Sequence, residues 1–434
     1  MTTNTDKLST RRDFLKTSAV IGGALMAPAI LPSRSFAGGN SDTLKIGLIG
    51  CGGRGSGAAS QALSADQNVV LTAMGDAFGD HLKSSLGELQ KHFGDKVKVD
   101  EAHQFVGLDA YQKVIDSGVD VVLLATPPVF RPIHLKAAVA AGKHIFCEKP
   151  VATDAPGVRS VMETVAESKK KGLCLVAGFC WRYNLAEQAL FERILAGDIG
   201  EIRVGYGTYY SGPVHPIPPE NERAAGMGDL EWQLRNWQNF CWLSGDSLVE
   251  QAVHAVDWLC WAMKETPPVK AVAVGGRQIP SNGGNIFDHF EVNYEYANGA
   301  RGFIGSRQQP GCYNNNTATF FGTEGTAHEM GFASKPFIKG SKPWQYKGER
   351  PDMYQIEHNH LFAAIRAGKA VNDGDRLASS TLVAIMGRMA AYTGEEITWE
   401  MAMKSKENLM PAELSWDAKL PVAARAMPGE TRFA

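Results

Sequence analysis

A lysine and a histidine, far apart in the chain, are the residues whose types and surroundings could do chemistry. Lys149 stands in the triplet Glu148-Lys149-Pro150, directly after the apolar segment His144–Cys147. If that segment is a parallel strand, the charged pair lies at its carboxyl end, where ligands of open α/β sheets bind. A solvated Glu-Lys loop is the alternative interpretation of the triplet taken alone.

The histidine belongs to a pattern of polar residues in an otherwise apolar segment. Glu250, His254, Asp257 and Trp261 recur at spacings of four, three and four. One helix over Leu248–Met263 would therefore carry all of them on one side. A histidine with a carboxylate one turn away suits proton transfer near neutral pH. A buried histidine that is merely hydrogen-bonded by Asp257 is the competing interpretation.

A glycine-rich loop precedes both groups. It has the pattern G-x-G-x-x-G and lies between the apolar segment Lys45–Ile49 and a predicted helix at Ser56–Leu63. Such a loop needs glycine for a tight turn, for close approach to a pyrophosphate and for helix–strand packing, and the helix N-terminus faces the negative charge. The candidate cofactor-binding residues of this loop are Gly50, Gly52, Gly53, Arg54 and Gly55.

Two later positions extend this dinucleotide site. Asp76 follows the apolar segment Val69–Met74 and is placed to accept a hydrogen bond from a ribose 2′-hydroxyl. A carboxylate there repels a 2′-phosphate, so NAD is favoured over NADP. Thr126 and Pro127 end the segment Val119–Ala125 and are expected on the nicotinamide side, although an ordinary proline-stiffened loop remains a competitor. Glu148 and Lys149 would complete the cofactor site.

The first part of the chain alternates short apolar runs with helical stretches. This alternation predicts a parallel sheet covered by helices on both faces, in a dinucleotide-binding domain over residues 43–180. The predicted strands are Leu44–Ile49, Val69–Met74, Val119–Ala125, His144–Cys147 and Leu173–Gly178, and the predicted helices are Gly57–Ala65, Asp80–His92 and Ile133–Ala141.

From about Glu201 the pattern changes to long alternating runs, with a hairpin turn at Asn298-Gly299. They predict a large, mostly antiparallel open sheet in a second α/β domain, residues 181–434, for substrate binding and oligomerisation. The predicted strands are Glu201–Tyr210, Phe290–Tyr296 and Arg301–Arg307, and the later helices are Gln355–Ala367 and Asp375–Ala391.

Composition excludes several classes of protein. The 434 residues carry a formal net charge of −2, so there is no electrostatic reason to bind nucleic acid. The seven cysteines form no Cys-x-x-Cys pair, and we interpret them as small buried hydrophobes. His358-Asn359-His360 lacks ligand spacing, so no metal site is expected.

Residues 1–37 have the features of a twin-arginine export leader. Arg11-Arg12 lies in a polar segment, followed by the apolar stretch Ala19–Leu31 and a small-residue cleavage site, Ser35-Phe36-Ala37. The apolar stretch is too short to span a bilayer. We expect the Tat export machinery to recognise the leader. Cleavage would then leave a periplasmic or otherwise exported protein without a membrane anchor; an uncleaved anchor is the alternative.

The chain after the leader resembles the Gfo/Idh/MocA oxidoreductase family. The resemblance rests on the glycine loop, Asp76, the E-K-P triplet, the acidic-x-x-x-His segment, the stretch 178–184 (GFCWRYN) and the segments 391–394 and 397–399. It implies a Rossmann domain that binds NAD and a substrate domain with a large open sheet. It also implies that Lys149 orients the substrate and that His254 is the general acid/base. Glu250 takes the place of the family's usual aspartate, which shifts the geometry of this catalytic carboxylate. A homodimer or homotetramer through the open sheet is a further expectation.

Tryptophans suggest the class of substrate. Six of the nine lie between residues 181 and 261. Aromatic faces can stack on the C–H faces of a pyranose, so a sugar or cyclic polyol is favoured, with core packing as the alternative. The candidate substrate-binding residues are Arg182, Asn184, Arg235, Asn236, Trp237 and Asp257.

Three functions compete at this point. The first is an exported NAD-dependent oxidoreductase that acts on a secondary hydroxyl of a sugar, glycoside or cyclic polyol. The second is a glycosidase that uses tightly bound NAD in a closed cycle of oxidation, elimination and reduction, which needs no external cofactor pool. The third is a sugar-sensing protein that keeps the fold without catalysis, and the intact Lys149 and His254 pair argues against it.

Overall fold

The protein is described by a computed structural model over residues 42–434. The predicted leader, residues 1–37, lies outside these residues. Within residues 42–434, no helix combines the length and the apolar character that crossing a bilayer requires.

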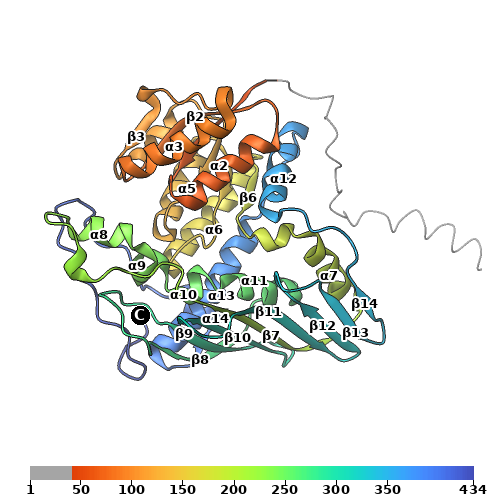
Figure 1. The fold of residues 1–434 in the computed structure, drawn as a ribbon. Coiled ribbons are helices and arrows are strands. Elements are labelled where there is room, and N and C mark those ends of the chain that lie inside the picture. Colours follow the sequence, from red (N-terminus) through yellow and green to blue (C-terminus); the bar gives the residue numbers. More distant parts are fainter. Residues whose placement is uncertain (1–41) are drawn as a thin grey trace, which may run out of the picture. The chain divides into compact units, whose positions relative to one another are not determined.

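The N-terminal domain contains a six-stranded parallel sheet in the order β3-β2-β1-β4-β5-β6 (Figure 1). Strand order reverses between β1 and β4, so the loops after these two strands open into one crevice. All five predicted strands are present, most with shifted ends, and β3 is additional. The strands are β1 (Leu44–Ile49), β2 (Val69–Asp76), β3 (Gln104–Val106), β4 (Val121–Leu124), β5 (His144–Cys147) and β6 (Leu175–Ala177).

Helices cover both faces of this sheet. Ile46 and Leu48 pack against the first set of helices, whereas Ile49 packs against the second, as the alternation of side chains along a strand requires. The first set is α2 (Gly53–Ala65), α3 (Gly79–Phe93) and α12 (Met353–Ala367), and the second is α4 (Ala110–Asp116), α5 (Arg131–Ala140) and α6 (Ala155–Lys170). Short 3-10 helices are η1 (Gly94–Lys96), η2 (Glu101–His103) and η3 (Pro128–Phe130).

Helix α12 comes from late in the chain yet belongs to the N-terminal domain. Its residues Leu361 and Phe362 are fully buried in the same cluster as Ala59 of α2. Figure 1 shows α12 beside α2 at the top of the molecule. The domain expected over residues 43–180 therefore includes a helix that the chain supplies about 170 residues later.

The second sheet has nine strands in the order β14-β13-β12-β11-β7-β10-β9-β8-β15. All neighbours are antiparallel except β7 and β10, which confirms the predicted, mostly antiparallel sheet. Gly299, at φ 81°, completes the predicted hairpin turn between β9 and β10. The strands are β7 (Ile202–Ser211), β8 (Lys270–Gly276), β9 (His289–Glu295), β10 (Arg301–Gln308), β11 (Asn315–Gly322), β12 (Gly325–Glu329), β13 (Phe337–Gly340), β14 (Trp344–Gln345) and β15 (Ile397–Thr398).

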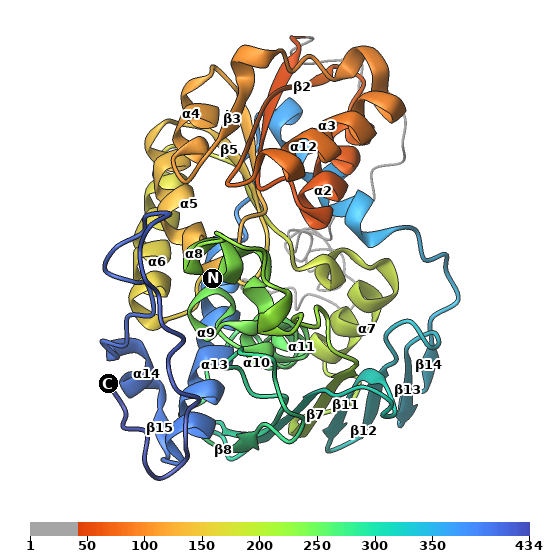
Figure 2. The same ribbon diagram turned by 60° about the vertical axis from the view of Figure 1, so that its left-hand side comes forward.

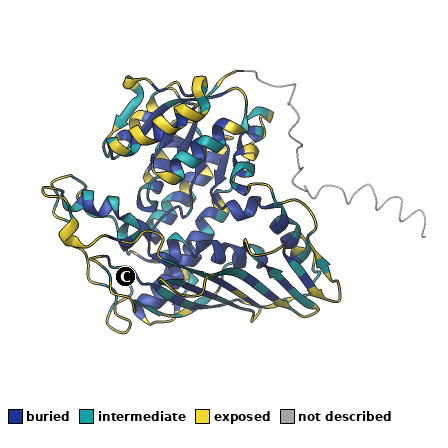
Figure 3. Ribbon diagram, in the orientation of Figure 1, coloured by how far each residue is buried: buried dark blue, intermediate teal, exposed yellow. Residues whose placement is uncertain are grey.

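One face of this sheet is covered by helices and the other is open. Val292 and Tyr294 are buried on the covered face, whereas Val272 and Val274 are exposed on the other. Figure 3 shows buried residues gathered between the sheet and its helices, among them α13, of which most residues are buried. The helices of this half are α7 (Leu185–Leu195), α8 (Asp229–Arg235), α9 (Cys241–Ser244), α10 (Ser247–Glu250), α11 (Val253–Ala262), α13 (Gly374–Thr393) and α14 (Trp399–Lys404), with η4 (Cys180–Tyr183), η5 (Glu220–Glu222) and η6 (Trp237–Asn239).

The single helix predicted over Leu248–Met263 is wrong. The chain forms α10 and α11 with a break between them at residues 251–252. In a continuous helix the N–H of His254 would donate to the carbonyl of Glu250. Instead it donates to Gln251 O at 3.3 Å, and Glu250 O accepts from Lys149 Nζ at 2.7 Å. The lysine thus takes a carbonyl that a regular helix would use internally.

A pair of carboxyl groups is buried between α7 and β12. Glu187 and Glu329 are each 1% exposed, and each carboxyl group influences the pKa of the other. Burial raises the pKa of Glu329 to about 8, and burial together with Glu329 raises the pKa of Glu187. Glu187 also accepts from Trp258 Nε1 at 2.8 Å. The pair therefore holds at least one proton at neutral pH.

This pair predicts how stability depends on pH. Between about pH 4.5 and pH 8 the native state keeps the Glu329 proton while the unfolded chain releases it, so stability falls as the pH rises. The Glu329→Gln substitution removes this proton, and we expect it to flatten the decline by about 1 kcal/mol per pH unit. Urea unfolding at pH 5, 6, 7 and 8 measures the effect. The matched control is Glu349→Gln at an exposed position, and an unchanged slope in Glu329→Gln would refute the assignment.

Candidate active site

The glycine loop has the shape that a pyrophosphate needs. Gly50 has φ 95°, and a Cβ on it would lie 2.7 Å from the backbone nitrogen of Thr126. A Cβ on Gly55 would lie 1.8 Å from Gly50 O, so this glycine lets α2 pack on the loop. By contrast, a Cβ on Gly52 or Gly53 would meet nothing within 4 Å. The first turn of α2 is therefore open to an approaching phosphate.

Asp76 lies at the end of β2, as predicted, against the glycine loop. Its carboxylate accepts from the N–H of Cys51 at 2.6 Å and from that of Phe78 at 2.9 Å. The hydrogen bond between Asp76 and His81 raises the pKa of His81. A carboxylate has about four lone-pair sites, so Asp76 can still accept from a ribose hydroxyl. The residues of the loop and Asp76 together fit a bound dinucleotide.

Arg54 ties the glycine loop to the E-K-P loop. Its guanidinium donates to Glu148, which is 4% exposed, and contacts Glu357 of α12 at 3.4 Å. Glu357 is fully buried, and burial followed by the charge of Glu148 raises its pKa. The cationic side chain lies 4.9 Å from the ring centroid of Tyr354. Arg54 thereby holds in place the carboxylate that precedes Lys149.

Lys149 and Glu250 meet across the two domains. Lys149 Nζ donates to Glu250 O at 2.7 Å and lies 3.6 Å from Glu250 Oε1. Both side chains are nearly buried, with 11% and 12% exposed. Arg131, at the start of α5, donates to Pro150 O at 2.5 Å and so holds the backbone next to the lysine. The ammonium group itself is positioned by Glu250 of the second domain.

His254 lies beside this pair in an aromatic environment. Its ring stacks on Tyr209 at 5.9 Å between centroids and meets Phe179 edge-on at 6.1 Å. Burial, followed by the charge of Lys149, holds the pKa of His254 well below its usual value. Its Nδ1 is buried and has no hydrogen-bond partner within residues 42–434. The imidazole is therefore neutral at pH 7 and able to accept a proton.

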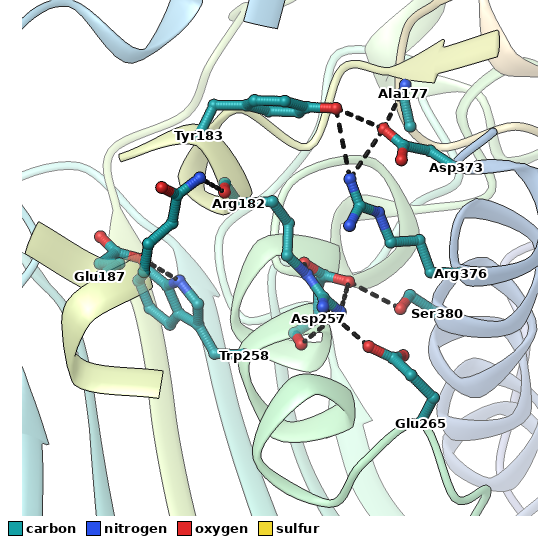
Figure 4. Close-up of polar contacts among 11 residues, drawn as sticks. Ala177, Arg182, Tyr183, Glu187, Asp257, Trp258, Glu265, Asp373, Arg376 and Ser380 are labelled. Carbon is teal, nitrogen blue, oxygen red and sulfur yellow. Dashed lines mark hydrogen bonds and ion pairs between the residues drawn. The ribbon is translucent and has the colours of Figure 1, made fainter. Parts of the chain in front are cut away.

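Arg182 and Asp257, predicted to bind substrate, bind each other instead (Figure 4). Arg182 Nε and Nη2 donate to the two oxygens of Asp257 at 2.7 and 2.8 Å, and Ser380 Oγ donates to the same carboxylate at 2.8 Å. Both ions are at most 5% exposed. Their hydrogen bonds are used inside the fold, so the pair stabilises η4 against α11 and does not offer groups to a sugar.

Three of the remaining substrate candidates also have hydrogen-bond partners within the protein. Asn184 caps α7, because its side chain accepts from the N–H of Ala186 at 3.0 Å. Arg235 binds Asp80, and Asn236 donates to a backbone carbonyl. Trp237 packs against a separate apolar cluster that contains Phe78 and Val129. That cluster lies next to the loops after β2 and β4, so Trp237 borders the cofactor edge of the site.

The expectation that the cysteines are buried is confirmed in part. Six cysteines are buried and free, as predicted, whereas Cys312 is exposed on the loop after β10, and its prediction as a buried residue is wrong.

Among the described residues, no group of three His, Cys, Asp or Glu side chains could hold a metal ion. A cavity of about 520 Å³ lies under the C-terminal segment, lined by residues such as Trp242, Tyr392 and Glu407, and does not include Lys149 or His254.

Sequence reasoning missed three residues of the site. Arg131 and Tyr209 are brought to Lys149 and His254 only by the fold, and no local pattern marks them. Glu357 lies two residues after Gln355, inside a helix that the sequence predicted but could not place beside the glycine loop. In the sequence, the only sign of a role for Glu357 is that it is a carboxylate on the otherwise apolar face of a predicted helix.

Fold and site together define a class of protein: two-domain NAD-binding oxidoreductases with a Rossmann domain and an open-sheet domain. Residues 44–179 match the description "Oxidoreductase family, NAD-binding Rossmann fold", and residues 188–328 match "GFO/IDH/MocA C-terminal domain". The chain belongs to the Gfo/Idh/MocA family.

Two curated relatives illustrate the range of this similarity. A glycosyl hydrolase family 109 protein of Solibacter usitatus is 31% identical over 209 residues, 47% of this chain and 46% of the relative. An inositol 2-dehydrogenase of Rhizobium meliloti is 31% identical over 162 residues, 37% of this chain and 44% of the relative. The chain thus aligns with somewhat less than half of the length of either relative.

Solved structures share the fold over most of the chain. Levoglucosan dehydrogenase in complex with NADH and levoglucosan matches with a TM-score of 0.65 at 20% identity, over 82% of this chain and 99% of that one. The aldose-aldose oxidoreductase of Caulobacter crescentus, complexed with glycerol, matches with a TM-score of 0.64 at 18% identity, again over 82% and 99%.

Two glycine substitutions test the geometry of the loop. Gly52→Ala adds a methyl group where the structure leaves open space, at φ −68°, which alanine accepts. We expect this variant to fold normally and to bind NAD at least about tenfold more weakly, because the methyl group blocks the pyrophosphate. Isothermal titration with NAD measures the affinity.

Gly55→Ala is the matched comparison. Its methyl group would lie 1.8 Å from Gly50 O, so we expect a loss of about 3 kcal/mol in the free energy of unfolding. If both variants lost stability equally, or if Gly52→Ala bound NAD as tightly as the wild type, the assigned roles of the two glycines would be wrong.

Proposed function

We propose that this protein is an NAD-dependent oxidoreductase that acts on a secondary hydroxyl group of a sugar, a glycoside or a cyclic polyol. The observation that carries the proposal is the convergence of Lys149, Glu250 and His254 at the carboxyl end of β5, beside a loop shaped for a dinucleotide. The names of its relatives, among them an inositol 2-dehydrogenase and a levoglucosan dehydrogenase, support this class of substrate.

The residues have separate tasks in this reaction. His254 accepts the proton of the hydroxyl group, because burial keeps its imidazole neutral. Lys149 donates a hydrogen bond to the developing alkoxide and stabilises its charge, since its ammonium group is held at the site by Glu250 O. NAD, when bound, supplies the hydride acceptor. Glu250 lies 3.6 Å from the ammonium group and orients it.

A glycosidase that uses bound NAD is the second candidate function, and one relative favours it. The glycosyl hydrolase family 109 protein matches at 31% identity, and a glycosidase with bound NAD would use the same proton acceptor and the same lysine. Release of an aglycone without net formation of NADH would support this candidate. Formation of NADH in proportion to oxidised sugar would support the first.

We also propose export through the leader at residues 1–37 and association through the open face of the second sheet. Val274 is 69% exposed there, with Val272 and Tyr206 at 44% and 40%. Exposed apolar groups on one open face favour burial against a second copy. We expect Val274→Lys to shift the protein towards the monomer in sedimentation velocity, with Val106→Lys as a control at an exposed valine of β3. A monomeric wild type would refute the association.

Replacement of the proton acceptor is the direct test of the main proposal. We expect His254→Gln to lower kcat/KM for NAD reduction by roughly 10²–10⁴-fold, because general-base catalysis contributes that much. NAD binding should stay normal, since His254 belongs to the second domain. The measurement is absorbance of reduced nicotinamide with a panel of hexoses, glycosides and cyclic polyols.

The pH dependence of activity is a second test of His254 as the base. Because the pKa of His254 is lowered, the imidazole stays unprotonated as the pH falls through 6.5, and activity declines only at lower pH. We expect the acid limb of kcat/KM in the wild type to lie below pH 6.5. His103→Gln, at an exposed histidine of η2, should leave rate and profile unchanged. An acid limb above pH 7, or full activity of His254→Gln, would exclude His254 as the base.

A further inference from the structure

Phe332 is an exposed aromatic side chain on the loop between β12 and β13. It is 71% exposed, and its ring lies against the buried ring of Trp181 at 4.7 Å between centroids and an angle of 52°. Covering an exposed apolar ring removes it from water and lowers the free energy. One face of Phe332 is thus supported by protein while the rest is free for a ligand.

The loop that carries Phe332 is held in place. Gly331 has φ 53°, and a Cβ on it would lie 2.3 Å from Asn316 O, so this close approach requires glycine. Its N–H donates to Glu329, and its carbonyl accepts from Arg350 Nη2 at 2.5 Å. A loop that is already fixed loses little conformational entropy when a ligand binds.

The ring behind Phe332 is equally fixed. Trp181 is 2% exposed and meets Trp258 edge-on at 5.3 Å. Trp258 in turn donates from Nε1 to Glu187 at 2.8 Å, as Figure 4 shows. Phe332 therefore forms the outer end of a rigid aromatic stack that begins in the core.

The same loop is linked to His254 through two intervening residues. Asn316, against which Gly331 lies, pairs with Tyr209 across β11 and β7, and Tyr209 stacks on His254. The Oδ1 atom of Asn316 is buried and has no hydrogen-bond partner among the residues that the structure describes. A buried acceptor of this kind can take a hydroxyl donor. The Asn316 acceptor and the Phe332 ring thus lie on neighbouring segments, and Tyr209 links Asn316 to the proposed base.

We propose that Asn316 and Phe332 form a subsite for a second ring of the substrate, next to the ring that reacts at His254. The ligand class is a glycoside: one sugar ring presents its hydroxyl group to His254, and a second sugar ring or an aromatic aglycone stacks on Phe332. This inference rests on the proposed function and narrows its substrate from sugars and polyols in general to glycosides.

Binding measurements test the subsite independently of turnover. The NAD-loaded protein is titrated calorimetrically with the methyl and the p-nitrophenyl glycosides of the same hexoses. We expect the wild type to bind the p-nitrophenyl glycoside of its preferred sugar about tenfold more tightly, because of the added ring stacking. Phe332→Leu should lose this preference, and Phe332→Trp should keep it.

The control is Phe321→Leu, at a phenylalanine of β11 that is 44% exposed on the other face of the sheet. It should keep the wild-type ratio of the two affinities. A wild type that does not prefer the larger glycoside, or a Phe332→Leu variant that keeps the preference, overturns the subsite. If the wild type preferred the p-nitrophenyl glycoside but reduced no NAD, the proposed function would be refuted and the subsite would stand. The two failures are therefore distinguishable.

Discussion

The hydrogen bond from the Lys149 ammonium group to the carbonyl of Glu250 is the contact on which the arrangement of the site depends. It joins the loop after β5 in the Rossmann domain to the break between α10 and α11 in the second domain. The break exists where this carbonyl is withdrawn from the helical ladder, and α11 then restarts with His254 in its first turn. One hydrogen bond therefore joins the lysine to the segment that leads into the helix of the histidine.

Arginine side chains hold the segments on either side of this hydrogen bond. Arg54 and Arg131 hold the two ends of the E-K-P loop, through Glu148 and the carbonyl of Pro150. Glu148 and Arg131 are each 4% exposed, so packing holds these two side chains in place once the fold has formed. The ion pair of Arg182 and Asp257 does the same for η4, a few residues from Phe179, which packs edge-on against the imidazole. The charged arginines thus hold in place the segments that carry Lys149 and the aromatic neighbour of His254.

The sequence was informative wherever a feature depends on neighbours in the chain. The glycine loop and Asp76 could be predicted because turn, strand end and helix start follow each other within about 30 residues. The break at residues 251–252 could not, because the lysine that binds the Glu250 carbonyl lies 101 residues away in the sequence. For the same reason Arg182 and Asp257 looked like free polar groups, although 75 residues apart they satisfy each other. The roles of Arg131 and Tyr209 likewise depend on contacts that only the tertiary fold creates.

The position of α12 bears on the order of events during synthesis. The Rossmann sheet is covered on one face partly by Leu361 and Phe362, so its six strands emerge from the ribosome well before this cover exists. Until residue 367 has been made, the part of this cover that α12 supplies is absent; Figure 2 shows α12 beside α2 from a second direction. Domains commonly fold as units while the chain is still growing. A shortened chain that ends after β6 would lack Leu361 and Phe362, and with them part of the apolar cover of this face.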